Sequence, residues 1–374
     1  MDKLGLIILA GGLSTRMGQP KALLSWVGGE SLISNALRKG LDADVNDILI
    51  SIGDDEQLGH AIQTHIIDTL SNDEQEKVSI VRDSIERCGP LGGLYSTLAV
   101  GPSPAYAVMA VDMPFMEMDL YFDWLYQVDY NDWNAIIPYD DSDKAEPMAG
   151  IYRTHIASLI QSVLVGEDMS LHHALDVIGH VEHVDASDYT WELSNINRFE
   201  DYQWARALAE NEFRRVPLIS VVASKRKTGK TTVVTRLVSE LQRVGLSVGV
   251  VKSDKHGFHM DHEGTDTDLA YKAGANAVAI AGPNETAIRI RTKEQSSLYD
   301  LTQHMPVDIV ILETRSQGIA PIIEVTKEGH TEELISDAMD RVATIEIGKL
   351  DQDVPELVRH IQEMMRCLHG RRYC

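Results

Sequence analysis

Short apolar runs rich in β-branched residues alternate with longer stretches of helical periodicity along the chain. The apolar runs in the first half predict strands at residues 4–10, 47–53, 78–82, 105–111, 133–138 and 180–185. The longer stretches predict helices at residues 31–40, 92–100, 119–127 and about 200–215. Strands that alternate with helices are typical of an α/β fold with a mostly parallel sheet.

The alternation starts again near residue 216. A buried-strand run at residues 218–223 passes through a glycine-lysine turn into a helical stretch at residues 230–245. Further strands are predicted at residues 247–251, 277–281, 307–312 and 341–347, and a last helix at residues 355–369. The join is short, because no Gly/Ser-rich or Pro-rich tract separates the two series. We therefore predict two α/β domains, residues 1–215 and residues 216–374.

Composition narrows the function classes. Apolar residues make up 44% of the chain, which is enough for a core in each domain. The chain has 34 Lys and Arg against 57 Asp and Glu, and the net charge of −23 disfavours binding to nucleic acids and to anionic membranes. The three cysteines are too scattered for a disulfide framework, and no stretch approaches the ~18 apolar residues of a membrane span. We expect a cytoplasmic protein.

The first predicted strand ends in a glycine loop with the residues Leu9, Ala10, Gly11 and Gly12. Glycine amides can face a phosphate closely, because no Cβ stands in the way. Arg16 and Lys21 follow in the same segment and supply the positive charge that a triphosphate needs. A tight turn between strand and helix is the alternative for the glycines alone, but the two cations favour a nucleotide site.

Two carboxylates are candidates for the same site. Asp112 follows the strand predicted at residues 105–111, and such folds bind ligands at the carboxyl edge of the parallel sheet. There Asp112 can hold Mg²⁺, which prefers oxygen ligands. Asp83 precedes a segment that contains Gly89 and Pro90, and a carboxylate in such a rigid loop can accept hydrogen bonds from a ligand. The alternatives are a strand-end turn for Asp112 and a solvated loop charge for Asp83.

These segments resemble the molybdenum cofactor guanylyltransferases (MobA), which belong to the nucleotidyltransferases that carry a Gly-rich loop, an Arg and a Lys. Blocks that match in the family's order include residues 83–84, 88–94, 112–115, 146–153 and 195–201. The resemblance covers roughly residues 4 to 205. The chain departs from the family at residues 50–53, where Ile-Ser-Ile-Gly replaces a segment that often contains a nucleotide-binding Asn.

The resemblance implies a Rossmann-like nucleotidyltransferase that transfers GMP from GTP to molybdenum-molybdopterin and releases pyrophosphate. The catalytic residues that it implies are Arg16, Lys21 and Asp112, with Asp112 as the Mg²⁺ ligand. The GTP-binding residues that it implies are Leu9, Ala10, Gly11, Gly12, Lys21, Asp83, Gly89, Pro90 and Asp112. A cytidylyltransferase or sugar-nucleotidyltransferase on the same fold stays open, although the Leu-Ala-Gly-Gly start favours guanine.

The second glycine loop joins a predicted strand to a predicted helix, as a phosphate-binding P-loop does. Its candidate residues are Ser224, Thr228, Gly229, Lys230, Thr231 and Thr232. Lys230 would reach the β and γ phosphates, Thr231 would ligate Mg²⁺, and the helix N-terminus would add partial positive charge. Ser224 replaces the first glycine of the pattern, the one most closely tied to the turn geometry. A plain basic turn is the alternative.

The residues after this loop resemble MobB, the nucleotide-binding adaptor of the same pathway. The matching positions are Lys252, His256, Asp261, Gly264, Asp266 and the acidic residue Glu313. The family usually continues with Gly-Phe-Lys, whereas this chain has Thr314, Arg315 and Ser316, which suggests weakened or altered GTP hydrolysis. A metal site is conceivable at His256, His259, His262, Asp261 and Glu263, although a polar loop that faces the nucleotide explains their spacing just as well.

Together the two resemblances imply a fusion of a MobA-like guanylyltransferase with a MobB-like P-loop NTPase domain that binds GTP. The implied cofactor is Mg²⁺, the substrates are GTP and molybdenum-molybdopterin, and the protein partners are molybdoenzyme apo-proteins or their chaperones. Three questions stay open: a homodimer through the C-terminal domain, a weak GTPase activity there, and a binding module that delivers cofactor without chemistry. A P-loop kinase or ATPase at residues 218–374 is a further alternative.

Overall fold

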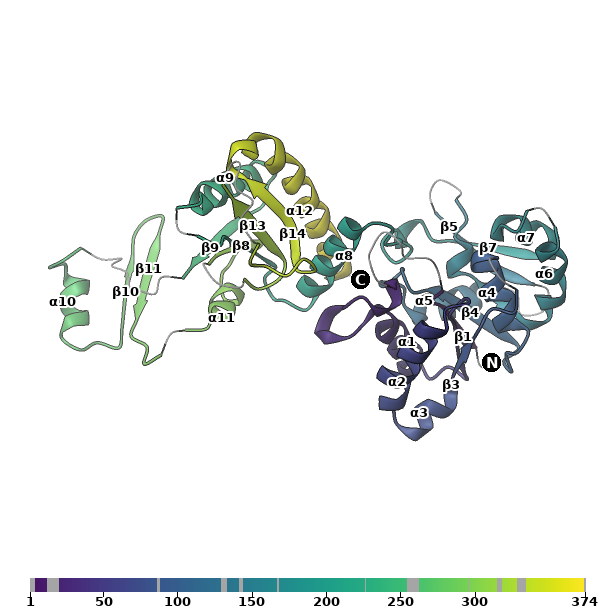
Figure 1. Cartoon of the computed structure of the whole chain (residues 1–374). Helices are drawn as coiled ribbons and strands as arrows, with labels where there is room; N and C mark the ends of the chain where they lie inside the picture. The colour runs from purple at the N-terminus through teal and green to yellow at the C-terminus, as the bar shows by residue number, and fades with distance from the viewer. Residues whose placement is uncertain are drawn as a thin grey trace. The chain divides into compact units, whose positions relative to one another are not determined.

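The computed structural model describes residues 4–11, 20–85, 88–128, 133–140, 144–166, 168–225, 227–253, 262–294, 296–314, 318–327 and 334–372. The chain divides into two compact units, Met1–Tyr202 and Gln203–Cys374, each of which is described by itself (Figure 1). This division falls earlier than the boundary that we predicted after residue 215. It lies inside helix α8 (Phe199–Glu212), most of which belongs to the second unit.

Within the described residues, the sheet of the first unit has seven strands in the order β3-β2-β1-β4-β6-β5-β7. The strands are β1 (Gly5–Leu9), β2 (Ile48–Ser51), β3 (Val78–Val81), β4 (Ala105–Ala110), β5 (Ala135–Tyr139), β6 (Ile151–Arg153) and β7 (Val181–Asp185). The pairings are parallel except those of β6, which runs antiparallel to β4 and β5. The carboxyl ends of β1, β2 and β4 therefore meet at one edge.

Helices cover both faces of this sheet. On one face, α4 (Gly89–Leu98), α6 (Ala157–Leu164) and α7 (Leu171–Ile178) bury a core that includes Ile7 and Leu9 of β1. On the other face, α1 (Leu32–Asp42) lies so close that a Cβ at Gly40 would be 2.6 Å from the side chain of Leu6. Neighbouring strand residues point to opposite faces, which explains the two layers. The remaining helices are α2 (Glu56–His65), α3 (Asn72–Lys77) and α5 (Met118–Gln127).

The second unit contains a five-stranded sheet in the order β14-β13-β8-β12-β9, and each of its pairings in the described residues is parallel. Its strands are β8 (Leu218–Val222), β9 (Val248–Lys252), β12 (Ile309–Glu313), β13 (Ile322–Thr326) and β14 (Arg341–Glu346). The helices α9 (Lys230–Arg243) and α12 (Leu350–Arg372) lie together (Figure 1), and α11 (Leu298–Gln303) packs against β9 and β12.

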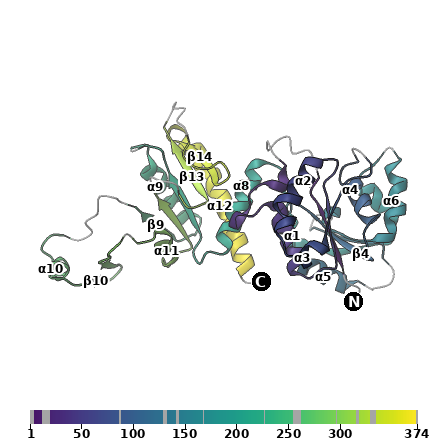
Figure 2. The same ribbon diagram turned by 60° about the horizontal axis from the view of Figure 1, so that its bottom comes forward.

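The strand predicted at residues 277–281 is confirmed as β10 (Ala277–Ala281), but it lies outside the parallel sheet. It pairs antiparallel with β11 (Thr286–Ile290) in a separate hairpin, and α10 (Asp266–Lys272) packs beside β10 (Figure 2). Strand β13, next to β8 in the sheet, was missed because Glu324 interrupts its apolar run. The buried Glu324 carboxylate accepts hydrogen bonds from the backbone amides of Ile335 (2.8 Å) and Ser336 (3.0 Å).

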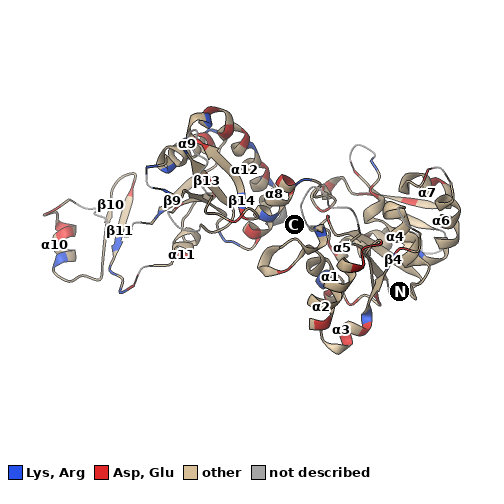
Figure 3. Ribbon diagram, viewed as in Figure 1, with Lys and Arg blue, Asp and Glu red and all other residues tan. Residues whose placement is uncertain are grey.

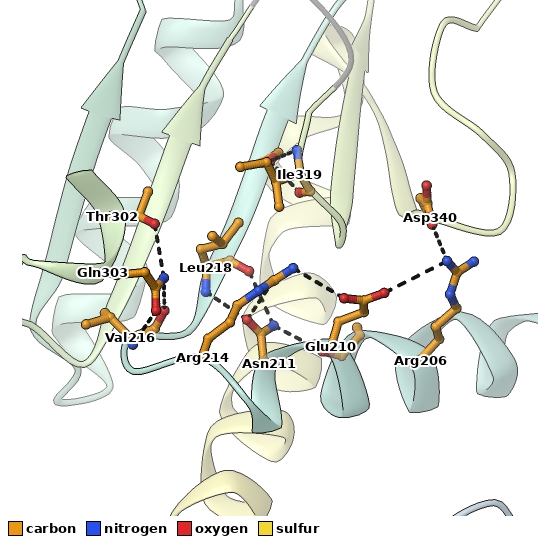
Figure 4. Close-up of polar contacts among 12 residues, drawn as sticks. Arg206, Glu210, Asn211, Arg214, Val216, Leu218, Thr302, Gln303, Ile319 and Asp340 are labelled. Carbon is orange, nitrogen blue, oxygen red and sulfur yellow. Dashed lines mark hydrogen bonds and ion pairs between the residues drawn. The ribbon is translucent and has the colours of Figure 1, made fainter. Parts of the chain in front are cut away.

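Buried amides anchor the segment that enters β8 (Figure 4). Asn211 of α8 is fully buried, and its side chain bonds both the amide (2.9 Å) and the carbonyl (3.3 Å) of Leu218. Gln303 of α11 does the same for Val216, at 3.2 Å and 3.0 Å. Since a buried backbone group without a partner is costly, these two side chains fix where the second sheet begins.

The surface carries acidic side chains on helices of both units, including α3 and α10 (Figure 3). This distribution agrees with the formal net charge of −23. Among the helices that the structure describes, none combines the length and the apolar character required to cross a membrane.

Candidate nucleotide sites at the two glycine loops

The first unit brings Lys21 and Asp112 together, 91 residues apart in sequence. The Lys21 Nζ lies 2.9 Å from the Asp112 carboxylate, and both side chains are largely buried. Lys21 follows the loop after β1 and Asp112 follows β4, so the parallel pairing of these two strands sets their proximity. The backbone carbonyl of Asp112 accepts a hydrogen bond from the amide of Ile196 at 2.8 Å, which places the 195–201 block beside the pair.

Helix α1 holds the loop after Asp112. The Asn35 side-chain amide donates to the carbonyl of Pro114 at 3.0 Å, and the Lys39 ammonium donates to the same carbonyl at 2.7 Å and to that of Met116 at 2.8 Å. Lys39 also pairs with Glu117 at 2.7 Å. Backbone carbonyls that would otherwise lack partners are thus satisfied, and the position of Asp112 is fixed. The sequence did not single out Asn35 or Lys39, whose contacts are made far along the chain.

A glycine is required where the loops after β1 and β2 meet. A Cβ at Gly11 would lie 2.6 Å from the backbone nitrogen of Gly53, closer than real Cβ contacts. The amides of Ala10 and Gly11 both donate to the carbonyl of Ser51, at 2.9 and 3.0 Å. Gly11 therefore serves the close approach of two backbones, and its amide is already used within the fold.

Asp83 is positioned by Ser51. The Ser51 hydroxyl donates to the Asp83 carboxylate at 3.1 Å, and the Asp83 amide donates to the carbonyl of Gly53 at 2.8 Å. A Cβ at Gly93 of α4 would lie 2.5 Å from the Ser51 hydroxyl, and a Cβ at Gly92 would lie 3.4 Å from the Asp83 carboxylate. Burial raises the pKa of Asp83, although the Ser51 hydrogen bond opposes this shift. Ser51 lies in the segment 50–53, where the MobA resemblance implies an Asn, and its hydroxyl orients the Asp83 carboxylate.

In the second unit, the loop between β8 and α9 has the geometry of a P-loop. Gly229 adopts a left-handed φ of 103°, and a Cβ there would lie 2.3 Å from the side chain of Ile347. Among the described residues of this loop, Lys227 also has a positive φ, of 59°, whereas Ser224 does not. A serine is therefore tolerated at position 224 without backbone strain, because the left-handed turn lies three and five residues later.

A cavity of about 550 Å³ opens at this loop. Its lining residues are Lys227, Thr228, Gly229, Lys230, Thr231, Lys252, Ser253, Glu313 and Thr314. Lys230 is buried at the N-terminus of α9, a helix of 14 residues whose first amides add partial positive charge. The hydroxyl of Thr231 donates to the carboxylate of Glu313 at 3.2 Å, and Lys252 lies 3.3 Å from the same oxygen. Cationic side chains, a helix N-terminus and hard oxygen donors suit a polyphosphate with a divalent cation.

The comparison with known families separates the two units. Residues 6–181 match the MobA-like NTP transferase domain family, and residues 218–346 match the molybdopterin guanine dinucleotide synthesis protein B (MobB) family. The chain joins a MobA-like NTP transferase domain to a MobB domain. It is therefore a nucleotidyltransferase, as the MobA resemblance predicts.

Curated relatives match the length of one domain. A "Probable molybdenum cofactor guanylyltransferase" of Bacillus cereus (strain G9842) is 27% identical over 215 residues, which is 57% of this chain and 100% of that protein. A protein of the same name from Bacillus mycoides (strain KBAB4) is 26% identical over 217 residues, again 57% of this chain and 100% of the relative.

Solved structures resemble each domain separately. The molybdopterin-guanine dinucleotide biosynthesis protein A of Archaeoglobus fulgidus is 18% identical, with a TM-score of 0.45, and the match covers 55% of this chain and 98% of that one. A MobB protein homolog from Bacillus stearothermophilus is 18% identical, with a TM-score of 0.29, over 39% of this chain and 98% of that one.

The MobA-like domain places the other predicted residues as follows. Leu9 and Ala10 are buried at the end of β1, while Gly89, with a φ of 57°, and Pro90 begin α4. Gly12 and Arg16 lie outside the described residues.

Glu146 belongs to a matching block of the sequence but was given no role; its backbone amide donates to the carbonyl of Pro138 near the end of β5. Burial raises its pKa, Lys144 opposes the shift, and the negative charge of Asp112 adds to it. Glu146 therefore shares the electrostatic environment of Asp112.

In the MobB domain, the cavity gathers Thr228, Gly229, Lys230, Thr231 and Glu313 of the predicted set. Ser224 and Thr232 are exposed and are not among the lining residues. The sequence missed Lys227 and Ser253, and it named Lys252 without giving it a role. Its conceivable metal site cannot be placed, because His256, His259 and Asp261 lie outside the described residues, as do Arg315 and Ser316.

Proposed function

We propose that the MobA-like domain transfers GMP from GTP to molybdenum-molybdopterin, which yields the guanine dinucleotide cofactor and pyrophosphate. The observation that carries this proposal is the Lys21–Asp112 pair, at 2.9 Å, at the carboxyl edge of a parallel sheet. The names of the relatives from Bacillus cereus and Bacillus mycoides support the choice of guanine and of the molybdenum cofactor.

In this mechanism, a phosphate oxygen of the pterin attacks the α-phosphorus of GTP, and the bond from that phosphorus to the bridging oxygen of the leaving pyrophosphate breaks. The attacking oxygen is already anionic, so no side chain has to remove a proton. Lys21 supplies positive charge to the triphosphate and helps to orient it. The Asp112 carboxylate is a hard oxygen donor at the same point and fits Mg²⁺, which when bound neutralises phosphate charge.

Base selection is assigned to Asp83. The Ser51 hydroxyl donates to the Asp83 carboxylate and the Asp83 backbone amide donates to the Gly53 carbonyl, so the carboxylate presents its acceptor oxygens in a fixed direction. Guanine offers two adjacent N–H donors on one edge, and cytosine does not offer the same pair. The half-buried position of Asp83 strengthens such hydrogen bonds.

The MobB domain is proposed to bind GTP with Mg²⁺ at its P-loop, through Lys230, Thr231 and Glu313. The hydroxyl of Thr231 and the carboxylate of Glu313, 3.2 Å apart, are oxygen donors suited to Mg²⁺. A GTPase activity there is proposed to be weak, because Thr314 follows Glu313 where the MobB resemblance implies a glycine.

Pyrophosphate release tests the main proposal. Purified protein, molybdopterin-loaded substrate and Mg²⁺ are combined with GTP, CTP or ATP, and pyrophosphate is measured. Release with GTP alone supports the assignment. Release with CTP would keep the mechanism and overturn the choice of base. No pyrophosphate release with any of the three nucleotides would favour a module that delivers cofactor without catalysing nucleotidyl transfer. The Asp83→Ala variant should lose the preference for GTP.

We further propose a homodimer through the MobB domain. The hairpin β10–β11 forms its own two-stranded sheet, and Ile280, Ile288 and Ile290 on it are 58%, 63% and 64% exposed. A lone hairpin is only marginally stable, and exposed apolar side chains favour burial by a partner. Light scattering should give twice the chain mass for the wild type and the monomer mass for Ile288→Asp; a monomeric wild type contradicts the proposal.

Molybdoenzyme apo-proteins or their chaperones are the proposed recipients of the product, in the cytoplasm.

A further inference from the structure

Lys252 and Glu313 face each other because of strand register. Strands β9 and β12 run parallel, and Lys252 and Glu313 are direct partners at the carboxyl ends of the two strands. Their side chains pair at 3.3 Å between Nζ and Oε1. The same Oε1 atom accepts the hydroxyl of Thr231 at 3.2 Å. A single carboxylate oxygen therefore links the P-loop helix to the end of β9.

The two members of this ion pair differ in their freedom to move. The side chain of Glu313 is 9% exposed, whereas that of Lys252 is 53% exposed. An ion pair with one exposed partner is weak, because water screens it and the lysine loses rotamer freedom by staying. Glu313 is thus fixed in the wall of the cavity, and Lys252 can leave it when another cation takes its place at the buried carboxylate.

The cavity also places Lys252 away from the P-loop itself. Lys227 and Lys230 lie in the loop after β8 and at the start of α9, while Lys252 lies at the end of β9, which β12 separates from β8. The phosphates closest to the loop are served by Lys230 and the amides of α9. Lys252 enters the cavity from the end of β9, beside the Thr231–Glu313 bond, where it can meet the terminal phosphate.

We infer that Lys252 is a specificity-determining residue of the MobB domain, which leaves Glu313 for the terminal phosphate of a nucleoside triphosphate and so discriminates triphosphate from diphosphate. This inference rests on the proposed binding of GTP at the P-loop. Thr231 and Glu313 fit a divalent cation, and a cation drawn to that carboxylate competes with Lys252 for it. The exchange couples the terminal phosphate to β9.

Nucleotide titrations of the full chain test this inference. The dissociation constants of a non-hydrolysable GTP analogue and of GDP are measured with Mg²⁺ for the wild type, Lys252→Gln and Lys252→Arg. Binding that remains in Lys230→Ala reports the MobA-like site and is subtracted. Lys252→Gln should weaken the triphosphate about tenfold and GDP less than twofold, because one charge-assisted hydrogen bond is lost only with the triphosphate. Lys252→Arg should keep most of the discrimination.

Lys272→Gln is the matched control. Its side chain is 54% exposed and pairs with the carboxylate of Asp268 at 2.7 Å, but it does not line the cavity. It should leave both affinities unchanged. Equal losses of triphosphate and diphosphate affinity in Lys252→Gln, or no loss of either, would overturn the inference. If Lys230→Ala also leaves nucleotide binding intact, the P-loop site itself is wrong, and pyrophosphate release by the MobA-like domain reports on the main proposal independently.

Discussion

Each of the two domains pairs a lysine with a carboxylate at the carboxyl ends of parallel strands. The Lys21–Asp112 pair in the MobA-like domain is 2.9 Å long, with side chains 22% and 17% exposed. The Lys252–Glu313 pair in the MobB domain is 3.3 Å long, with exposures of 53% and 9%. The first pair is thus sheltered on both sides, whereas the second has a lysine that is largely in solvent.

The surroundings of the two pairs differ as well. The MobB loop leads into α9, whose N-terminus adds partial positive charge beside Lys230. In the part of the first loop that the structure describes, Lys21 begins a 3-10 turn of three residues, Lys21–Leu23, which has little dipole. The MobB site can therefore hold phosphates with backbone groups at the start of α9, and the described part of the MobA-like site brings together side chains from distant segments.

The largest effect is expected from Asp112→Ala. This change removes the carboxylate proposed to hold Mg²⁺, so GMP transfer should fall about 10³-fold, while the fold should persist because Asp112 lies at a strand end. Pyrophosphate release and thermal unfolding check the two halves of this expectation. Asp119→Ala, an exposed acid in the first turn of α5, is the control and should transfer normally. Turnover of Asp112→Ala at the wild-type rate would remove the metal assignment.

Lys230→Ala should weaken nucleotide binding at the P-loop of the MobB domain without affecting the MobA-like site. Loss of the buried P-loop lysine should weaken nucleotide binding by the MobB domain about 100-fold, because the charge that meets the β and γ phosphates is gone. Calorimetric titration with GTP should then show one site per chain instead of two, and pyrophosphate release should stay within twofold. If Lys230→Ala instead abolishes pyrophosphate release, the roles of the two domains have been reversed.

Gly93→Ala tests how closely α4 approaches Ser51. A Cβ there would meet the Ser51 hydroxyl at 2.5 Å, so the helix must shift at a cost of about 1 to 3 kcal/mol. Calorimetry should show a lower unfolding temperature for the MobA-like domain and an unchanged MobB transition. Gly370→Ala is the control: no atom lies within 4 Å of its added Cβ, and α12 should gain about 0.5 to 1 kcal/mol. An unaffected MobA-like transition in Gly93→Ala would contradict the close packing.

The smallest effect concerns Asp83 and pH. Burial raises the pKa of this carboxyl in the folded state, so its contribution to stability is present below the unfolded value of 3.8 and is lost as pH rises through the folded value. Asp83→Asn should therefore be slightly more stable than the wild type at neutral pH, and the gain should vanish in acid. Urea denaturation at several pH values measures this. A variant that is less stable at neutral pH would show that Ser51 more than offsets the cost of burial.

Contiguous motifs could be predicted well from the sequence. Lys230 and Thr231 follow a strand and begin a helix, as predicted, and both line the cavity, while their binding of nucleotide stays a prediction. The pairing of Lys21 with Asp112 was also foreseeable as a shared site, because their strands lie in a parallel sheet. What the sequence could not give is the distance between them, which depends on the register of β1 and β4.

Contacts that depend on strand register or on local backbone conformation could not be predicted from the sequence. Ser51 reaches Asp83 because β2 and β3 lie side by side. The departure from the family pattern at residues 50–53 suggested the loss of a nucleotide contact, but Ser51 in this segment donates a hydrogen bond to Asp83. The serine at position 224 looked like a defect because the pattern places a glycine there. Among the described residues of this loop, the left-handed positions are Lys227 and Gly229, which no periodicity of side chains encodes.

Helix α8 determines where the chain can be cut without loss of contacts in the second unit. The MobB family match begins at residue 218, yet the fully buried Asn211 of α8 holds the backbone of Leu218 at both its amide and its carbonyl. A recombination or proteolytic cut at the family boundary would leave the first strand of the second unit without these bonds. The second unit therefore includes part of α8, upstream of its family match, and this part completes the bonding of its first strand.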